Sequence, residues 1–255
     1  MLRPPISPLR LTIVLPCFNE AANVRTVVEA ALRVGRDVAQ ELEVVVVDDG
    51  SRDATASIVA ELEREAPEVR RVSHPTNLGY GAALRSGFLA ARMPWVFYTD
   101  GDGQFDLEEL HGILPLLESH DIVSCYRLSR RDGPMRFVLG RAFTWACDAL
   151  LGLDLVDVNC AFKLYPRALF DAFEIRSRGA LVDAEVLAAA RALGLRVAQP
   201  GVPHRPRRGG TQTGASPKVV ARAALELSGL CLRRFAPAPP ALRASTRTSK
   251  HLAAQ

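Results

Sequence analysis

The sequence predicts an α/β fold: a doubly wound, mostly parallel sheet flanked by helices. Through about residue 125, short apolar runs typical of strands alternate with stretches of helical periodicity. One run, residues 43–47, is so uniformly β-branched that it suits the interior of a parallel sheet covered on both faces. With 255 residues and 48% hydrophobic content, the chain is long enough for one substantial core.

The first expected strand covers residues 11–15. Apolar residues at helical spacing then predict a helix over residues 22–32, which Gly35 is expected to end. After the strand at 43–47, Ser51 is expected to cap a second helix.

The same alternation continues toward residue 125. The further elements expected are a strand over 69–72, a helix over about 81–92, and strands over 95–98 and 122–125. Asp106 and Glu109 are spaced as a capping box for a helix before the last of these strands. In doubly wound sheets ligands bind beyond the carboxyl ends of the strands, so we expect the functional site there.

Cysteine usage and the N-terminus predict a cytoplasmic protein. The five cysteines are scattered and never spaced as C-x-x-C, which argues against a disulfide framework and against a zinc site. Pro4, Pro5 and Pro8 stand where a signal peptide needs an apolar run, and no 18 apolar residues are consecutive. The expected location is the cytoplasm, with peripheral attachment to the inner face of the membrane as an option.

The net charge of +4, with a pI near 9.0, indicates anionic ligands or an anionic surface. The excess is concentrated around residues 127–141 and 205–218. Two tryptophans, four tyrosines and no recognisable binding motif give a nucleic-acid partner little support, so none is expected.

The most specific motif follows the strand at 95–98, where Asp100, Asp102 and Gln104 are separated by single glycines. Oxygen donors at this spacing suit a hard divalent cation, and small intervening residues allow another group to approach it closely. This pattern favours a metal-bridged pyrophosphate. A polar turn after a strand is the alternative, because Asp and Gly are common in turns.

Three other polar motifs also follow expected strands, at residues 16–20, 48–51 and 77–81. All four motifs can converge on one edge of the sheet. Adjacent carboxylates at Asp48 and Asp49 cost stability unless donors or a ligand offset them. Taken singly, an acid at a helix start or a glycine in a turn has an ordinary structural explanation. Neither a P-loop nor a dinucleotide-binding motif is present in the sequence.

Together these motifs resemble the inverting nucleotide-sugar glycosyltransferases with the GT-A fold, and most closely the dolichyl-phosphate (polyprenyl-phosphate) mannosyltransferase branch. The resemblance covers about residues 11–225 and is carried by Pro16-x-Phe18-Asn19-Glu20, Asp48-Asp49-Gly50-Ser51, Asn77-x-Gly79-x-Gly81-Ala82, Asp100-x-Asp102-x-Gln104, Tyr126-Arg127, Arg136, Asp157-x-x-Cys160-x-Phe162-Lys163 and His204-x-x-Arg207. This chain has Ala161 where the family commonly has glycine, and we expect no membrane-spanning tail of the kind that many relatives carry.

The resemblance implies a nucleoside-diphosphate sugar donor and a divalent cation, Mg²⁺ or Mn²⁺. It places the base and ribose of the donor near Pro16, Phe18, Glu20, Asp48 and Asp49. It assigns the cation and diphosphate to Asp100, Asp102 and Gln104, with Asp102 central to catalysis. It also assigns phosphate or sugar binding to Arg127 and Arg136, and donor binding to Arg207 in a basic loop. For Arg130 and Arg131, a solvated basic surface is the favoured interpretation.

The acceptor decides whether a base is needed. A lipid monophosphate has a second pKa of about 6 and is largely deprotonated at neutral pH, so it needs none. A hydroxyl acceptor needs a base, for which Asp157, Asp183 and Glu185 are the candidates. Glu185 lies near the start of an expected helix, so a surface acid stabilised by the helix dipole is at least as well supported.

The predicted domain boundaries are an N-terminal extension over 1–10, a GT-A domain over 11–216, an amphipathic helix over 217–235 and a disordered tail over 236–255. The basic, glycine-rich stretch 204–214 is either a lid over a diphosphate or a surface segment. The amphipathic helix either packs on the core or lies on an anionic membrane.

The sequence therefore predicts metal-dependent, inverting transfer of a hexose, mannose or glucose, from GDP-mannose or UDP-glucose to polyprenyl or dolichyl phosphate at the cytoplasmic membrane face. Two alternatives stay open: transfer to a hydroxyl of a soluble or polysaccharide acceptor, and a non-catalytic nucleotide-sugar-binding subunit. The residues do not indicate the donor base, the sugar or the oligomeric state.

Overall fold

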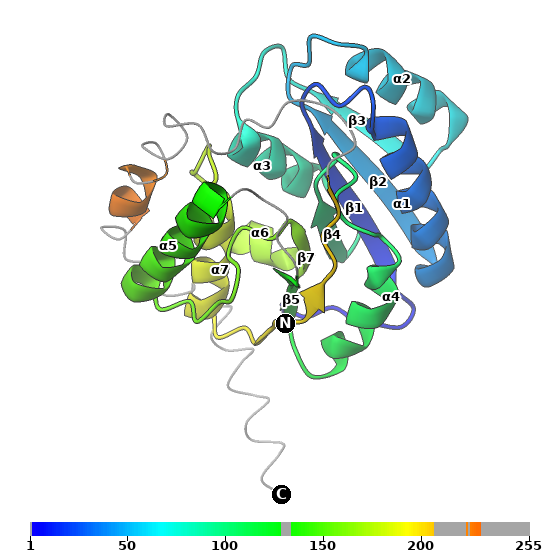
Figure 1. The fold of residues 1–255 in the computed structure, drawn as a ribbon. Coiled ribbons are helices and arrows are strands. Elements are labelled where there is room, and N and C mark those ends of the chain that lie inside the picture. Colours follow the sequence, from blue (N-terminus) through cyan, green and yellow to red (C-terminus); the bar gives the residue numbers. More distant parts are fainter. Residues whose placement is uncertain (1, 129–133, 207–222, 224, 231–255) are drawn as a thin grey trace, which may run out of the picture.

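The computed structural model describes residues 2–128, 134–206, 223 and 225–230 (Figure 1). Its main sheet has seven strands in the order β3-β2-β1-β4-β7-β5-β8, and β6 pairs with β9 in a second, two-stranded sheet. The strands are β1 (Arg10–Cys17), β2 (Glu41–Asp48), β3 (Val69–Ser73), β4 (Trp95–Thr99), β5 (Ile122–Ser124), β6 (Tyr126–Arg127), β7 (Phe162–Pro166), β8 (Val197–Ala198) and β9 (Gly201–Val202). The helices are α1 (Val24–Val38), α2 (Thr55–Glu65), α3 (Tyr80–Ala90), α4 (Glu109–Ile113), the 3-10 helix η1 (Leu114–Glu118), α5 (Pro134–Leu151), α6 (Ala168–Ala172) and α7 (Val182–Ala192).

The predicted α/β class with a mostly parallel sheet is confirmed. Strands β3, β2, β1 and β4 are parallel neighbours, with Ile13 of β1 between Val44 of β2 and Phe97 of β4. Because these strands are parallel, their carboxyl ends lie at one edge of the sheet, and the chain returns through a helix in each crossover. The sequence did not predict β7, which is antiparallel to both β4 and β5 and separates them.

Helices cover both faces of the sheet (Figure 1). On one face, Gly35 of α1 lies against the side chain of Leu42. On the other, Gly87 of α3 lies against Val14 and Val47, which fits the alternation of side chains along β2. Phe88 of α3 stacks on Phe170 of α6 at 4.2 Å, so α6 shares the face of α3.

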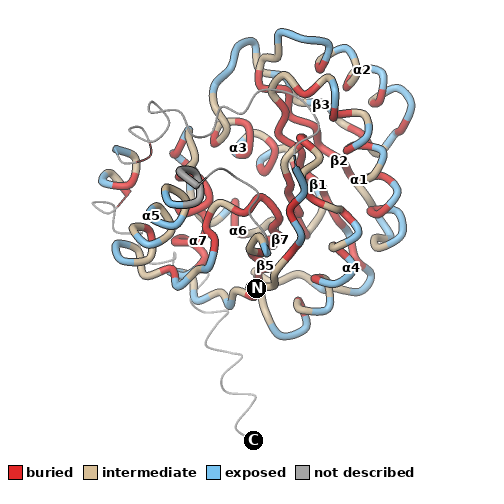
Figure 2. The backbone as a smooth tube through the Cα atoms, in the orientation of Figure 1, coloured by how far each residue is buried: buried red, intermediate tan, exposed pale blue. Residues whose placement is uncertain are grey.

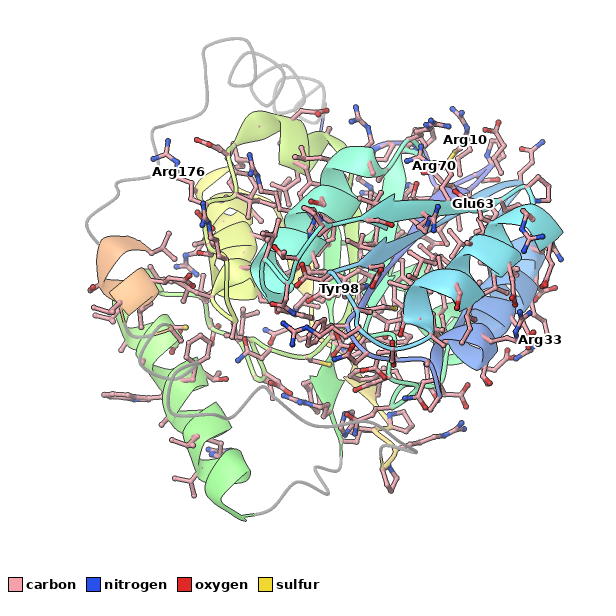
Figure 3. All side chains as sticks on the ribbon, turned by 90° about the horizontal axis from the view of Figure 1, so that it is seen from above. Arg10, Arg33, Glu63, Arg70, Tyr98 and Arg176 are labelled. Atoms are coloured by element: carbon pink, nitrogen blue, oxygen red, sulfur yellow. The ribbon has the colours of Figure 1, made fainter. Side chains whose placement is uncertain are left out.

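The core follows the central strands β1, β2, β4, β5 and β7, whose residues are mostly buried in the centre of the molecule (Figure 2). Residues 44–47 of β2 are fully buried, which confirms their expected place inside the sheet. Tyr98 lies in the interior, whereas Arg10, Arg33 and Arg176 lie at the periphery (Figure 3).

Three local predictions were wrong. Gly35 does not end α1, which continues to Val38. The glycine instead allows close packing, since a Cβ there would come 2.6 Å from Leu42 Cδ1. Ser51 does not cap α2; Asp53 accepts the Thr55 N–H at 3.0 Å instead, while the Ser51 hydroxyl accepts the Asn19 N–H. The Asp106–Glu109 capping box is also absent from the described contacts of α4, where Asp106 accepts from the Glu108 N–H at 3.3 Å.

Most of the expected amphipathic helix over 217–235 and all of the expected tail over 236–255 lie outside the described residues. Of the described positions there, Ala223, Leu227 and Leu230 are buried, and Leu227 and Leu230 belong to the core. Within the described residues, we find no helix with the length and apolar character needed to cross a bilayer.

Candidate active site

The loops that follow β1, β2 and β4 meet at the carboxyl edge of the sheet, as the motifs predicted. The Asp49 N–H donates to Cys17 O at 2.9 Å, and the Gly101 N–H donates to Pro16 O at 3.3 Å. A Cβ on Gly101 would come 2.4 Å from Cys17 Sγ, so only glycine lets these two loops approach so closely. The end of β1 thus lies between the other two motifs.

The predicted donor-binding residues of the first two motifs lie around this junction. Pro16 and Glu20 are buried and Phe18 is half-buried. Glu20 Oε2 accepts from Asn23 Nδ2 at 2.8 Å, and Asp48 Oδ1 accepts from the Ser51 N–H at 3.1 Å. These hydrogen bonds orient both carboxylates within the loops that would meet a nucleotide.

Asp49 has a clear structural role. Its two oxygens accept the N–H groups of Leu78 and Gly79, each at 2.9 Å, and Oδ1 also lies 2.6 Å from His74 Nδ1. On the far side of the imidazole, His74 Nε2 lies 2.9 Å from Ser86 Oγ. Asp49 therefore fixes the loop between β3 and α3, and these donors offset the cost of a second carboxylate beside Asp48.

The glycines of this loop pack against main chain. Gly79 has φ +103°, and a Cβ there would come 2.7 Å from Arg178 O. The Gly81 N–H donates to the same carbonyl at 3.0 Å. The first turn of α3 is therefore joined to the segment that precedes α7, a contact that no motif predicted.

The predicted metal ligands lie together in the loop after β4. Asp102 is 8% exposed, and its Oδ1 accepts the Gln104 N–H at 3.0 Å. Asp100 is half-buried, and its Oδ1 accepts the Tyr80 hydroxyl hydrogen at 2.9 Å. Gln104 donates through Nε2 to Arg205 O at 3.0 Å, so its side chain also joins this loop to the segment after β9.

The donor set fits a divalent cation. Burial and the neighbouring Asp102 raise the pKa of Asp100 to about 7, against the opposing effects of Tyr80 and Arg127. Two close carboxylates in such surroundings gain from a cation that neutralises them. Among the described residues no group of three or more acidic, cysteine or histidine side chains is arranged so that it could hold a metal ion by itself, and Mg²⁺ typically takes only one or two carboxylates plus phosphates and water.

Arg127 of β6 lies close enough to the acidic loop for its charge to lower the pKa of Asp100. It forms a bidentate ion pair with Asp157, at 2.7 Å from Nε to Oδ2 and 3.0 Å from the second nitrogen to Oδ1. Its strand β6 pairs with β9, and the chain after β9 continues to His204, which bridges Phe105, and to Arg205. This short strand connects the arginine to the loop after β4, which carries Asp100 and Asp102.

A pocket of about 130 Å³ lies beside this ion pair. Its lining includes Arg127, Asp157 and Arg141, together with the apolar side chains of Leu128 and Val156. The pocket therefore combines two guanidinium groups with an apolar rim.

Several predicted basic residues are not placed by the structure. Arg136 lies in α5, but its side chain is outside the described residues. The same holds for the whole of Arg130, Arg131 and Arg207. Their roles remain predictions.

All three candidate bases are engaged within the protein. Asp157 is paired with Arg127, and Asp183 Oδ1 accepts from Lys163 Nζ at 2.8 Å and from the Tyr98 hydroxyl. Glu185 is 2% exposed and accepts the Ser177 N–H at 2.8 Å, so its alternative interpretation as a surface acid was wrong. A helix-start position does not by itself indicate exposure, and here the preceding segment folds over the carboxylate.

Comparison with known proteins agrees with this architecture. Glucosyl-3-phosphoglycerate synthase from Mycobacterium tuberculosis, in a crystal structure with phosphoglyceric acid, superposes with a TM-score of 0.71 over 90% of this chain and 82% of that one, at 21% identity. A crystal structure of that enzyme with Mn²⁺, uridine diphosphate and glucosyl-3-phosphoglycerate gives 0.67 over 88% and 81%, at 22% identity. At these identities the likeness shows the GT-A fold.

Residues 12–173 match the model of the family described as "Glycosyl transferase family 2", and the chain belongs to this family. It is 32% identical over 164 residues to undecaprenyl-phosphate 4-deoxy-4-formamido-L-arabinose transferase of Pseudomonas fluorescens, covering 64% of this chain and 48% of that protein. It is 31% identical over 168 residues to dodecaprenyl-phosphate galacturonate synthase of Rhizobium johnstonii, covering 63% and 49%. The chain thus spans about half the length of these curated relatives.

Proposed function

We propose that this protein transfers a sugar from a nucleoside-diphosphate donor to a polyprenyl phosphate, with inversion and with a divalent cation. The observation that carries the proposal is the convergence of Asp48, Asp100, Asp102 and Arg127 at the carboxyl edge of a family 2 fold. Relatives named as undecaprenyl- and dodecaprenyl-phosphate sugar transferases support the lipid acceptor. Those two act on formamido-arabinose and galacturonate by name, so the sugar here can differ from mannose or glucose.

The acidic loop would hold the cation through Asp100, Asp102 and Gln104. When bound, Mg²⁺ or Mn²⁺ would neutralise charge on the departing nucleoside diphosphate. Glu20 and Asp48 are oriented by hydrogen bonds within loops that face the same edge, where they would contact base and ribose. Arg127, kept in place by Asp157, presents a fixed guanidinium suited to a phosphate oxygen.

The occupied state of the three candidate bases favours a phosphate acceptor. Asp157 is paired with Arg127, Asp183 with Lys163, and Glu185 accepts main-chain N–H groups. A phosphate monoester supplies its own nucleophilic oxygen near neutral pH and needs no proton removed. The geometry thus agrees with an acceptor that requires no base.

An apolar surface beside the Arg127 pocket supports the lipid character of the acceptor. Leu128 and Val156 of the pocket rim are 60% and 61% exposed, and Val138 and Trp145 of α5 are 60% and 73% exposed. Exposed apolar patches of this kind mark interaction sites, and a tryptophan suits the interface of a membrane. We assign this surface to the bilayer that carries the polyprenyl phosphate.

The decisive experiment is transfer of labelled sugar into an organic-extractable lipid, using polyprenyl phosphate in detergent with Mn²⁺ or Mg²⁺. GDP-mannose, UDP-glucose and UDP-glucuronate or UDP-galacturonate form the donor panel. Lipid product with one donor is the expected result, and Asp102→Ala should abolish it. Metal-dependent donor hydrolysis without lipid product would instead indicate a hydroxyl acceptor, and metal-dependent transfer retained by Asp102→Ala would overturn the metal assignment.

A second variant separates the membrane surface from the chemistry. Trp145→Ser should reduce transfer to polyprenyl phosphate embedded in anionic vesicles, because a large apolar side chain is lost from the contact surface. Transfer to a short-chain, water-soluble isoprenyl phosphate should be unchanged. Equal losses with both acceptors would contradict the assignment of this surface to the bilayer.

A further inference from the structure

We infer that Tyr80 is a positioning residue for Asp100, and that it sets the affinity of the acidic loop for its divalent cation. This inference rests on the proposed function. It assigns a purpose to the hydrogen bond between Tyr80, the first residue of α3, and Asp100, which lies near the buried cluster of Tyr98, Asp183 and Lys163.

The hydrogen bond from Tyr80 fixes the orientation of the Asp100 carboxylate. The phenol donates to Oδ1 at 2.9 Å, so the carboxylate cannot rotate without breaking this bond. A cation bound through Asp100 would therefore meet an oriented ligand, as second-layer hydrogen bonds commonly provide at metal sites.

The backbone on both sides of Tyr80 is fixed as well. Asp49 accepts the Gly79 N–H at 2.9 Å, and Arg178 O accepts the Gly81 N–H at 3.0 Å. A Cβ on Gly81 would come 2.6 Å from Ser177 O, so the two chain segments are in direct contact. The ring of Tyr80 consequently projects from a main chain that is held from two directions.

The environment of the phenol directs its hydrogen toward Asp100. The Tyr98 hydroxyl is near enough to interact electrostatically with Tyr80. That hydroxyl donates its own hydrogen to Asp183 and accepts from Lys163 Nζ at 3.1 Å. The Tyr80 hydroxyl itself donates to Asp100, which carries charge when ionised, and such hydrogen bonds are the stronger ones.

The buried Lys163–Asp183 ion pair in turn holds the Tyr98 hydroxyl. Lys163 is fully buried, and its Nζ also donates to Cys160 O at 2.5 Å. Asp183, Tyr98 and this carbonyl together accept the three ammonium hydrogens of Lys163. Tyr80 thus joins a fixed segment of main chain to the acidic loop.

The test is Mn²⁺ binding to the full-length protein in the presence of UDP or GDP, measured from the electron paramagnetic resonance signal of free Mn²⁺. Tyr80→Phe keeps the ring and removes the donor. We expect it to weaken Mn²⁺ binding about tenfold, the effect typical of losing an outer-layer partner of a metal ligand. Its Mn²⁺ concentration for half-maximal transfer should rise by the same factor.

Tyr165→Phe is the matched control. Tyr165 is a fully buried tyrosine on the same face of the sheet, and its hydroxyl has no hydrogen-bond partner among the described residues. The Tyr165→Phe variant should bind Mn²⁺ as the wild type does.

The outcomes separate the inference from the proposed function. If the unmodified protein binds Mn²⁺ and Tyr80→Phe binds it with the same affinity, the role of Tyr80 is overturned but the proposed function is not. A lower melting temperature with unchanged Mn²⁺ affinity would show that Tyr80 serves folding only, and it has the same consequence. No Mn²⁺ binding by the unmodified protein with either nucleotide would overturn the metal-dependent function and this inference together.

Discussion

Replacing Lys163 by methionine isolates the energetic role of the buried ion pair. Lys163 is fully buried, and Asp183 beside it is 3% exposed, with Nζ and Oδ1 2.8 Å apart. Methionine preserves most of the side-chain volume but removes the ammonium. Asp183 then keeps a buried charge without its cation, which typically costs about 3 to 5 kcal/mol. For a domain of this size that loss corresponds to a melting temperature lower by about 6 to 20 °C.

The assay is equilibrium urea unfolding followed by far-UV circular dichroism, with the slope compared between variants. The control is Arg167→Met, which removes the cation of the exposed Arg167–Asp171 pair, whose side chains are 37% and 55% exposed. It should change the free energy of unfolding by less than about 1 kcal/mol. The double variant Lys163→Met with Asp183→Leu should recover part of the loss, because it removes the uncompensated charge. A loss below about 1 kcal/mol for Lys163→Met at equal slope would refute this reasoning.

Three further results are expected. Gly81→Ala should lower the free energy of unfolding by about 1 to 3 kcal/mol in urea titrations, because its Cβ would come 2.6 Å from a main-chain carbonyl oxygen. Its control is Gly112→Ala, which should be neutral or stabilising because a Cβ there meets nothing within 4 Å. Tyr165→Phe should leave the free energy of unfolding unchanged or raise it by up to about 1 kcal/mol, since the buried hydroxyl lacks a described partner; a clear loss would show that the hydroxyl is hydrogen-bonded in solution. Burial raises the pKa of Cys160 to about 12, so the native thiol should react with iodoacetamide at pH 8 at least about 1000-fold more slowly than in the unfolded chain, as measured by peptide mass spectrometry, and fast native labelling would contradict this.

The alternation of strands and helices, and the place of the motifs, could be predicted from sequence because both depend on local patterns. The apolar runs at β1, β2 and β4 and the acids that follow them lie at one edge, as expected. Periodicity within a segment determines which residues face a core, and parallel pairing brings the strand ends together.

The features that sequence did not predict depend on contacts between distant segments. Gly35 looks like a helix terminator until Leu42 is seen against it. Glu185 looks like a surface acid, but the main chain at Arg176 and Ser177 folds over it. Tyr80 was missed because nothing in a single sequence shows that its hydroxyl reaches Asp100, 20 positions away. The available signal was the Gly79-Tyr80-Gly81 sequence at the start of the helix. A large polar ring between two glycines is uncommon there, and it indicates a specific contact of the hydroxyl.

The antiparallel strand β7 has a consequence for how the protein is made. β4 has β1 on one side and β7 on the other, and β7 begins at Phe162, long after β4 ends at Thr99. At ribosomal speeds of about 5 to 20 residues per second, β4 is completed several seconds before its second neighbour is synthesised. During that interval its fully apolar segment Trp95–Tyr98 has an unpaired edge, which is the kind of surface that chaperones bind and that aggregates if left uncovered. The nascent chain is therefore most vulnerable while the ribosome translates α5, and synonymous codons that slow this stretch should lower the soluble yield without changing the finished protein.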